Sequence, residues 1–368
     1  MISLKSTATN GFLYDHVVGT GGIGSGMFFI LEGNHNLGRN ESRMATLLPS
    51  IDFCKLQIIM HYMAVFLGAK NRDGFQLFAV SRVGNDVTGR NLVRQMEDVG
   101  INTVNIAVSE TGHTLFSVCF QYPDHSGGNI TVANSASSEV SATDISRFFS
   151  EFAMPGSREV ILAVPEVPLP ARISILQYGR ERGSLNVASV LSSEVNEWMH
   201  ANGVELVDLL FINIDEAGSI AGMKDDAIPS QTVADACINK LLPLNPLIRV
   251  LITDGSNGCY CWEKDQLTMV PALQVPVCST AGAGDAFLAG TVTGLICGLP
   301  LTKGISDSYF SETPLQSAVE LGTLIASLSV TSFNTIHLEA DTELLVSFCE
   351  KNNVKFGDGF IDLFKQGP

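Results

Sequence analysis

The sequence contains no long apolar segment and no C-x-x-C pair of cysteines. No apolar run reaches the roughly 20 residues that a membrane-spanning helix needs, and the first residues, MISLKSTATNGF, lack the apolar stretch of a signal peptide. The eight cysteines are scattered, so a zinc site is not predicted. We therefore expect a cytoplasmic protein whose cysteines are buried and reduced.

Positive charge is also scarce. Lysine and arginine total 22 against 38 aspartates and glutamates, which gives a net charge of −16. A surface this acidic repels nucleic acid and anionic membranes, so neither is predicted as a partner. An anionic small-molecule substrate remains compatible with this charge, because a binding site can be locally positive.

Strand-like apolar runs alternate with helical patterns along most of the chain. The expected strands are His16–Val18, Gln76–Arg82, Glu159–Val164, Ile173–Gln177, Leu206–Ile212, Arg249–Thr253 and Cys259–Glu263. The expected helices are Gln57–Leu67, Gly89–Val99, Ser193–Ala201, Thr232–Leu242, Asp285–Cys297 and Pro314–Ser329, with one more helix after Asp341 and then a frayed end. This alternation predicts an α/β fold with a mostly parallel central sheet and helices on both faces.

Two segments, about 26–50 and 104–134, lack helical periodicity and carry β-rich runs such as TLFSVCFQY and NITVAN. We expect them to form antiparallel strands that extend from the main sheet. The sequence shows no internal repeat and no obvious linker between domains. We therefore expect residues 1–368 to form a single domain with a small β extension.

The stretch VVGTGGIGSG, from Val17 to Gly26, contains a G-x-G-x-x-G pattern. A dinucleotide-binding fingerprint needs a helix to begin at the last glycines and an acidic residue about 20 positions later at a strand end. Here the glycines lead into the strand-like run Met27–Glu32. A tight turn with close backbone approach is therefore the preferred interpretation.

The segment Cys278–Asp285, CSTAGAGD, precedes a helical pattern and carries the strongest chemical signal. Small residues at a helix N-terminus leave backbone N–H groups free, and with the helix dipole these form an anion site suited to a phosphoryl group. A carboxylate at its edge, Asp285, could remove the proton from a hydroxyl that attacks phosphorus. The alternative is an ordinary glycine-rich turn in which Asp285 caps the helix.

This segment resembles the DTxGAGD signature of the PfkB/ribokinase family of small-molecule kinases. Other segments resemble motifs of that family in the same order: SRVGNDVTGRNLVRQMEDVGIN, NITVANSASSEVS, Glu166-Val-Pro168, Asn213-Ile-Asp-Glu216 and LITDGSNGCYCW. The resemblance spans most of the chain. It implies a ribokinase-like fold with a β lid, ATP and Mg²⁺ as cofactors, and a possible homodimer through the lid. It also implies that Gly19–Gly26 form the floor of the substrate pocket.

The resemblance also implies roles for individual residues. Asp285 would be the catalytic base, and Gly282, Ala283 and Gly284 would supply the anion hole. The residues implied at the nucleotide are Asn213, Glu216, Thr253, Gly255, Gly258, Thr280 and Asn334, with Glu216 near the magnesium ion. The residues implied at the acceptor are Gly24, Lys55, Gln57 and Glu166. Helix capping by Asn213 and Glu216, and a plain loop role for Asn334, are the structural alternatives.

The sequence departs from the family pattern mainly on the acceptor side. Gly24 stands where the family usually has an aspartate that binds substrate hydroxyls, and the family's GGxxxN motif is replaced by residues 54–59. Ser279 replaces an aspartate that helps to bind a monovalent cation in many relatives, so a potassium requirement is not implied. Basic and polar side chains near the acceptor could instead suit a substrate with a carboxylate or phosphate, or could be solvated charges. These side chains are Lys55, Gln57, His61, Arg39 and Arg43.

The leading interpretation is an ATP-dependent kinase that phosphorylates a hydroxyl of a sugar or sugar-like molecule. A nucleoside kinase of the same family is the main alternative for the substrate. A ligand-binding protein that has lost turnover, and a dehydrogenase, are alternatives of other classes. The missing acceptor residues favour the ligand-binding protein, whereas the intact Gly-Ala-Gly-Asp segment argues against it.

Overall fold

A computed structural model describes residues 3–6, 11–71, 74–124, 127–152, 156–223, 225, 227–303 and 314–364. Its main feature is a nine-stranded sheet in the order β14-β13-β12-β11-β10-β9-β1-β5-β6. The parallel strands are β1 (His16–Thr20), β5 (Gln76–Gly84), β6 (Ile106–Ser109), β9 (Glu159–Ala163), β10 (Leu185–Ser189), β11 (Leu209–Asn213) and β12 (Arg249–Thr253). The antiparallel hairpin of β13 (Cys259–Glu263) and β14 (Gln266–Val270) closes one edge.

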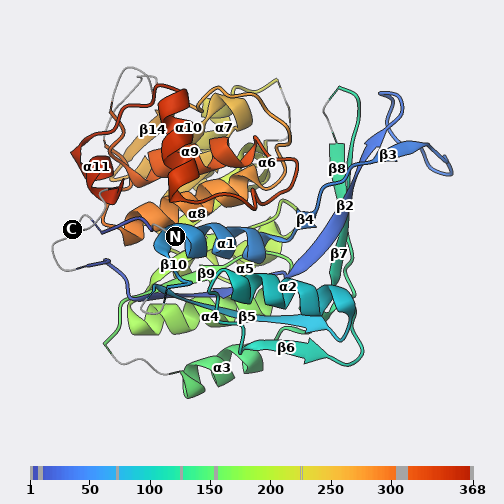
Figure 1. Ribbon diagram of the computed structural model, residues 1–368, viewed down its shortest axis with the longest axis horizontal. Helices are drawn as coiled ribbons and strands as arrows, with labels where there is room; N and C mark the ends of the chain where they lie inside the picture. The colour runs from blue at the N-terminus through green and yellow to red at the C-terminus, as the bar shows by residue number, and fades with distance from the viewer. Residues whose placement is uncertain are drawn as a thin grey trace.

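Helices cover both faces of this sheet (Figure 1). They are α1 (Lys55–Leu67), α2 (Val87–Asp98), α3 (Ala142–Glu151), α4 (Leu169–Arg182), α5 (Val195–His200), α6 (Ile214–Ala221), α7 (Ser230–Leu241), α8 (Ala283–Ile296), α9 (Ala318–Ser329), α10 (Thr342–Lys351) and α11 (Asp358–Phe364). Successive side chains of a strand enter opposite cores, as the pleat requires. Val17 of β1 belongs to the core under α1, α8 and α9, whereas Val18 belongs to the core under α3, α4 and α7.

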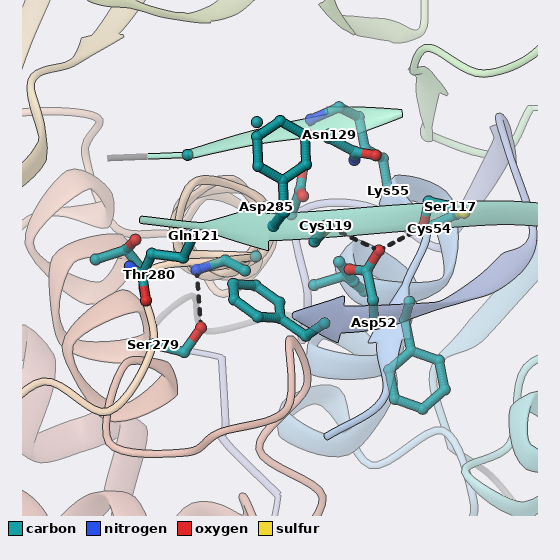
Figure 2. A pocket seen from close by; sticks show the side chains of 18 of the residues that line it. Asp52, Cys54, Lys55, Ser117, Cys119, Gln121, Asn129, Ser279, Thr280 and Asp285 are labelled. Atoms are coloured by element: carbon teal, nitrogen blue, oxygen red, sulfur yellow. Dashed lines mark hydrogen bonds and ion pairs between the residues drawn. The ribbon is translucent and has the colours of Figure 1, made fainter. Parts of the chain in front are cut away.

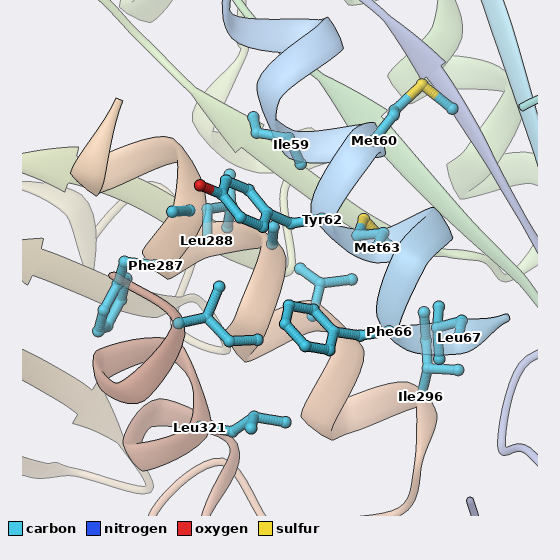
Figure 3. Close-up of a cluster of buried hydrophobic side chains, with 14 of the residues drawn as sticks. Ile59, Met60, Tyr62, Met63, Phe66, Leu67, Phe287, Leu288, Ile296 and Leu321 are labelled. Atoms are coloured by element: carbon cyan, nitrogen blue, oxygen red, sulfur yellow. The ribbon is translucent and has the colours of Figure 1, made fainter. Parts of the chain in front are cut away.

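The first core holds α1 and α8 in place. Tyr62 of α1 lies beside Leu288 of α8, and Phe66, one turn further along α1, belongs to the same core (Figure 3). Close approach of α8 to α9 depends on glycine, because a Cβ atom at Gly290 would lie 2.8 Å from the Cα atom of Gly322. Since α1 and α8 both begin at the site described below, this core sets the distance between their first residues. No helix in the described ranges is long and apolar enough to cross a membrane.

A smaller five-stranded sheet extends from one side of the main sheet (Figure 1). Its strands are β2 (Gly24–Leu31), β3 (Ala45–Leu47), β4 (Asp52–Phe53), β7 (Leu115–Gln121) and β8 (Gly127–Thr131). The order is β3-β2-β7-β8, and β4 pairs with β2. We call this sheet the lid. The predicted architecture of a mostly parallel sheet with a small β lid is thus confirmed.

Several predicted elements need correction. The run Ile173–Gln177 lies within helix α4, because a short apolar run does not distinguish a strand from a buried helix. Strand β6, predicted in the lid, pairs with β5 in the main sheet. In the lid β2 pairs with β7 in parallel, so the lid is not purely antiparallel. Strands β10 and β14 and helices α3, α6 and α11 were not predicted.

An ion-pair cluster at the start of the parallel strands gives a stability prediction. Glu159 is buried, and each of its carboxylate oxygens accepts a hydrogen bond from Arg182 Nε at 3.1 Å. Burial raises the pKa of Glu159, but hydrogen bonds from His16 and Arg182 outweigh it and lower the pKa to about 2. A folded-state pKa below the unfolded value contributes stability that is present above about pH 4.5 and is lost as the pH falls toward 2.

We expect Glu159→Gln to destabilise the fold by about 3 kcal/mol near pH 7. Urea unfolding should show that this difference from wild type falls to about 1 kcal/mol at pH 3. Asp15→Asn, which removes an exposed pair with Arg158, is the control and should change stability by less than about 1 kcal/mol. A difference between wild type and Glu159→Gln that does not vary with pH would contradict this account.

Candidate active site

Two cavities meet beside the first turn of α8. The first, of about 330 Å³, lies between the lid and the main sheet. The second, of about 480 Å³, lies along the ends of β11 and β12. Their linings share Lys55, Thr280, Gly282 and Asp285. Open α/β sheets bind their ligands at the carboxyl ends of the strands, and both cavities contain residues from those ends. We call them the lid cavity and the strand-end cavity.

Asp285 is the third residue of α8 and is buried. The N-cap of this helix is Gly282, at φ 78°, and no side chain caps it, so the helix-cap alternative for Asp285 does not hold. A Cβ atom at Gly282 would lie 2.5 Å from the backbone oxygen of Thr335, which requires glycine there. Ala283 N donates to Thr280 O at 3.2 Å, whereas no hydrogen bond in the described ranges engages Gly284 N. This leaves at least one backbone donor of the turn available to an anion.

Lys55 is the first residue of α1, and its Nζ lies 3.6 Å from Asp285 Oδ1. Among the described residues it is the one cationic side chain that lines either cavity. The charge of Asp285 raises the pKa of Lys55 above its usual value, although burial opposes this. Burial raises the pKa of Asp285, and Lys55 partly offsets that effect. The charge of Lys55 therefore favours the ionised form of Asp285, which lies where the two cavities meet.

Glu166 lines the lid cavity at the carboxyl end of β9. Its backbone is in the left-handed region, at φ 75°, which is costly for a residue with a side chain. Its Oε2 accepts a hydrogen bond from Lys55 N at 3.1 Å, and burial raises its pKa to about 7. The opening glycines make room for this side chain, because a Cβ atom at Gly22 would lie 2.4 Å from Glu166 Cβ.

Asn213 and Glu216 line the strand-end cavity at the start of α6. They form a reciprocal capping box, in which each side chain accepts a hydrogen bond from the other's backbone N–H at 2.8 Å. Burial raises the pKa of Glu216 to about 7. The other residues of this wall that the sequence pointed to are Thr253, Gly255, Gly258 and Thr280. Asn213 and Glu216 can therefore cap α6 and still lie on the wall of the strand-end cavity.

Three of the residues implied at the nucleotide or the acceptor line neither cavity, and the basic side chains of His61, Arg39 and Arg43 do not line them either. Gly24 begins β2, where a Cβ atom would lie 2.3 Å from Leu115 O, so this glycine serves strand packing. Gln57 is buried in α1. Asn334 Oδ1 accepts a hydrogen bond from Ile51 N at 2.8 Å and thus holds the chain that leads into β4. None of Gly19–Gly26 lines the lid cavity, so these glycines pack behind it and do not form its floor.

The sequence did not point to the lid residues of the lid cavity. The polar side chains from the lid are Asp52, Ser117, Cys119, Gln121 and Asn129 (Figure 2). Those of β7 alternate along the strand and share one face, a signal present in the run FSVCFQ. The sequence alone does not show which face of the lid meets the cavity.

Residues 68–342 match the model of the pfkB family carbohydrate kinases. The chain belongs to this family. It is 24% identical to the deoxyribokinase of Salmonella typhi over 71% of this chain and 77% of that one. It is 23% identical to the ribokinase of Haemophilus influenzae over 72% and 78%, respectively. The family predicted from the motifs is thus confirmed, and the chain is a carbohydrate kinase of the pfkB type.

Solved structures share the fold. A ribokinase from Cryptococcus neoformans in complex with ADP superposes with a TM-score of 0.67 at 19% identity, over 90% of this chain and 99% of that one. A Burkholderia thailandensis nucleoside kinase in complex with inosine superposes with a TM-score of 0.66 at 14% identity, over 91% and 98%. The ribokinase-like fold is therefore established.

Proposed function

We propose that this kinase transfers the γ-phosphoryl group of ATP to a hydroxyl of a sugar or sugar-like molecule. The observation that carries the proposal is the meeting of two cavities at one buried carboxylate, Asp285. The strand-end cavity would hold ATP and the lid cavity the acceptor. The complex of a related ribokinase with ADP supports the nucleotide assignment.

In this proposal Asp285 is the general base. Its carboxylate accepts the proton of the acceptor hydroxyl while the hydroxyl oxygen forms a bond to the γ-phosphorus, and the bond from that phosphorus to the bridging oxygen of ADP breaks. The backbone N–H of Gly284, in the first turn of α8, supplies a donor to the transferring group. The ammonium of Lys55 lies 3.6 Å from Asp285 Oδ1, close enough to stabilise the negative charge of the transferring phosphoryl group as well.

The strand-end cavity also fits a magnesium ion carried by the nucleotide. No group of three or more histidine, cysteine, aspartate or glutamate side chains in the described ranges could hold a metal. Asp215, Glu216 and Asp285 line this cavity, and Glu216 among them suits an ion that keeps most of its water and binds through substrate phosphates. When bound, magnesium would neutralise part of the triphosphate charge. The residues that would hold it are Glu216 and Asn213.

We expect Glu216→Gln to lower magnesium-dependent turnover about 10-fold or more and to change acceptor KM little. Glutamine keeps the capping box, so α6 should stay folded. Titration of magnesium at saturating ATP measures the effect. Glu197→Gln, a matched change in the exposed first turn of α5, is the control. An unchanged magnesium dependence of Glu216→Gln would contradict this role for Glu216.

A nucleoside is the second candidate acceptor. Phe28, Phe53 and Phe120 line the lid cavity, and aromatic rings stack well on a planar base. The inosine complex of a related nucleoside kinase is consistent with this candidate. Assays of ADP formation with a panel of sugars and nucleosides decide between them. Turnover of a nucleoside but not of its free sugar would favour the nucleoside.

Pairing of two chains through the lid stays a prediction. Strand β8 lies at one edge of the lid and is exposed along its whole length. An exposed edge strand offers unpaired backbone groups to a second strand. The mass of the protein in solution, measured by light scattering, tests this prediction.

A further inference from the structure

Asp52 places a buried carboxylate in the lid cavity, apart from the ion pair of Lys55 and Asp285. It lies in β4, beside β2, and lines the cavity. Its side chain is one of the few buried acidic groups of the lid, with 7% of the residue exposed. In the described part of the chain no ion pair joins it to a cation. A buried charge without a counter-ion is costly unless hydrogen bonds compensate it.

Two hydrogen bonds hold this carboxylate. Ser117 Oγ donates to Asp52 Oδ2 at 2.5 Å, and Cys119 Sγ lies 3.2 Å from the same oxygen. Figure 2 shows both contacts at the end of the cavity formed by the lid. A Cβ atom at Gly26 would lie 2.2 Å from Ser117 Oγ and 2.8 Å from Asp52 Oδ2, so the glycine makes this arrangement possible. Both bonds end on Oδ2, which leaves Oδ1 to accept hydrogen bonds from a ligand.

The charges of the lid cavity restrict the ligand further. Three carboxyl groups, those of Asp52, Glu166 and Asp285, line it together with one ammonium, that of Lys55. Lys55 is already paired with Asp285. Arg43 of the lid is not available either, because its Nε donates to Glu41 Oε1 at 2.7 Å. Since Asp285 is paired and burial raises the pKa of Glu166 to about 7, the unpaired carboxylate that a ligand's own carboxylate or phosphate would meet in this buried site is mainly that of Asp52.

We propose that Asp52 binds hydroxyl groups of the acceptor through Oδ1, and that the acceptor is an uncharged polyol and not a sugar acid or a sugar phosphate. The inference rests on the proposed function, because it takes the lid cavity as the acceptor site. It argues against the acidic or phosphorylated substrate that Lys55, Arg39 and Arg43 suggested from sequence. Hydroxyl donors and a carboxylate acceptor form charge-assisted hydrogen bonds, which are about twice as strong as neutral ones.

The test uses matched pairs of compounds that differ in charge. Examples are ribose with ribose 5-phosphate, fructose with fructose 6-phosphate, glucose with gluconate, and inosine with inosine monophosphate. Calorimetry measures binding to the full chain, and ADP formation measures turnover. We expect at least one neutral compound to bind, and to bind at least about 10-fold more tightly than its anionic partner.

The variant Asp52→Asn keeps the size of the side chain and removes its charge. We expect it to weaken binding of the best neutral compound about 10- to 100-fold, to raise the acceptor KM by a similar factor, and to leave the ATP KM within twofold. The ratio of neutral to anionic affinity should also fall. Glu32→Gln removes one exposed charge of the lid outside the cavity and is the control, with no change in this ratio expected.

Anionic compounds that bind as tightly as their neutral partners, or no binding by any neutral compound, would overturn the inference without need of a variant. A folded Asp52→Asn protein with unchanged affinity and unchanged ratio would also overturn it. Neutral compounds that bind without ADP formation would refute the proposed kinase activity on them and leave the inference on Asp52 standing. Preferential turnover of anionic compounds would support the kinase activity and refute the inference on Asp52.

Discussion

The substitution Asp285→Asn is expected to lower kcat by about 10²- to 10⁴-fold, the usual contribution of a general base. This corresponds to about 3–5 kcal/mol of the activation barrier. Asparagine keeps the size of the side chain but cannot accept the proton of the acceptor hydroxyl. Nucleotide affinity should stay within a few-fold, because the backbone of Gly282–Gly284 is unchanged. Single-turnover measurements with the true acceptor separate this chemical step from binding.

The structure supplies a matched control for this prediction. Asp341 is the N-cap of α10, and its side chain accepts a hydrogen bond from Leu344 N at 2.7 Å. Asparagine caps a helix about as well as aspartate, so Asp341→Asn should leave both stability and kcat unchanged. If Asp285→Asn behaves in the same way, with kcat within threefold of wild type, Asp285 is not the base. Only the anion site of the α8 turn would then remain.

The sequence predicts well those parts of the site that depend on local chain geometry. The run of small residues before α8 predicts the start of that helix, and capping by Asn213 and Glu216, the structural alternative for these two residues, is present at the start of α6. Both features arise within one turn of chain. The buried strands can also be predicted from the sequence, because a sheet covered on both faces needs continuous apolar runs such as that of β9.

The acceptor side was less predictable, because it is built from contacts between distant segments. Asp52 meets Ser117 only when β4 and β7 pair with β2, and the register of these strands is not encoded in any one of them. Gln57 and Lys55 both lie in the first turn of α1, so the sequence predicted both at the acceptor. Packing of α1 buries Gln57 and brings Lys55 to Asp285, which the helical pattern alone does not decide.

The ion pair between Lys55 and Asp285 leads to the second large effect. We expect Lys55→Met to lower kcat by about 10²-fold or more, because it removes the one cationic side chain in the described lining of both cavities. Methionine keeps the length and the apolar part of the side chain. The hydrogen bond from the backbone N–H of residue 55 to Glu166 is also retained. Removal of the charge should also affect the neighbouring carboxylate.

The pH profile distinguishes this electrostatic role from simple loss of packing. Burial raises the pKa of Asp285, and Lys55 lowers it, so loss of Lys55 should raise that pKa further. The base acts only when it is deprotonated, so the acidic limb of kcat/KM should move to higher pH in Lys55→Met. Lys55→Arg keeps the positive charge and should shift this limb less. If Lys55→Met lowers kcat but leaves the acidic limb where it is in wild type, the ammonium does not control the ionisation of Asp285, and its effect on turnover comes from the phosphoryl group or from packing alone.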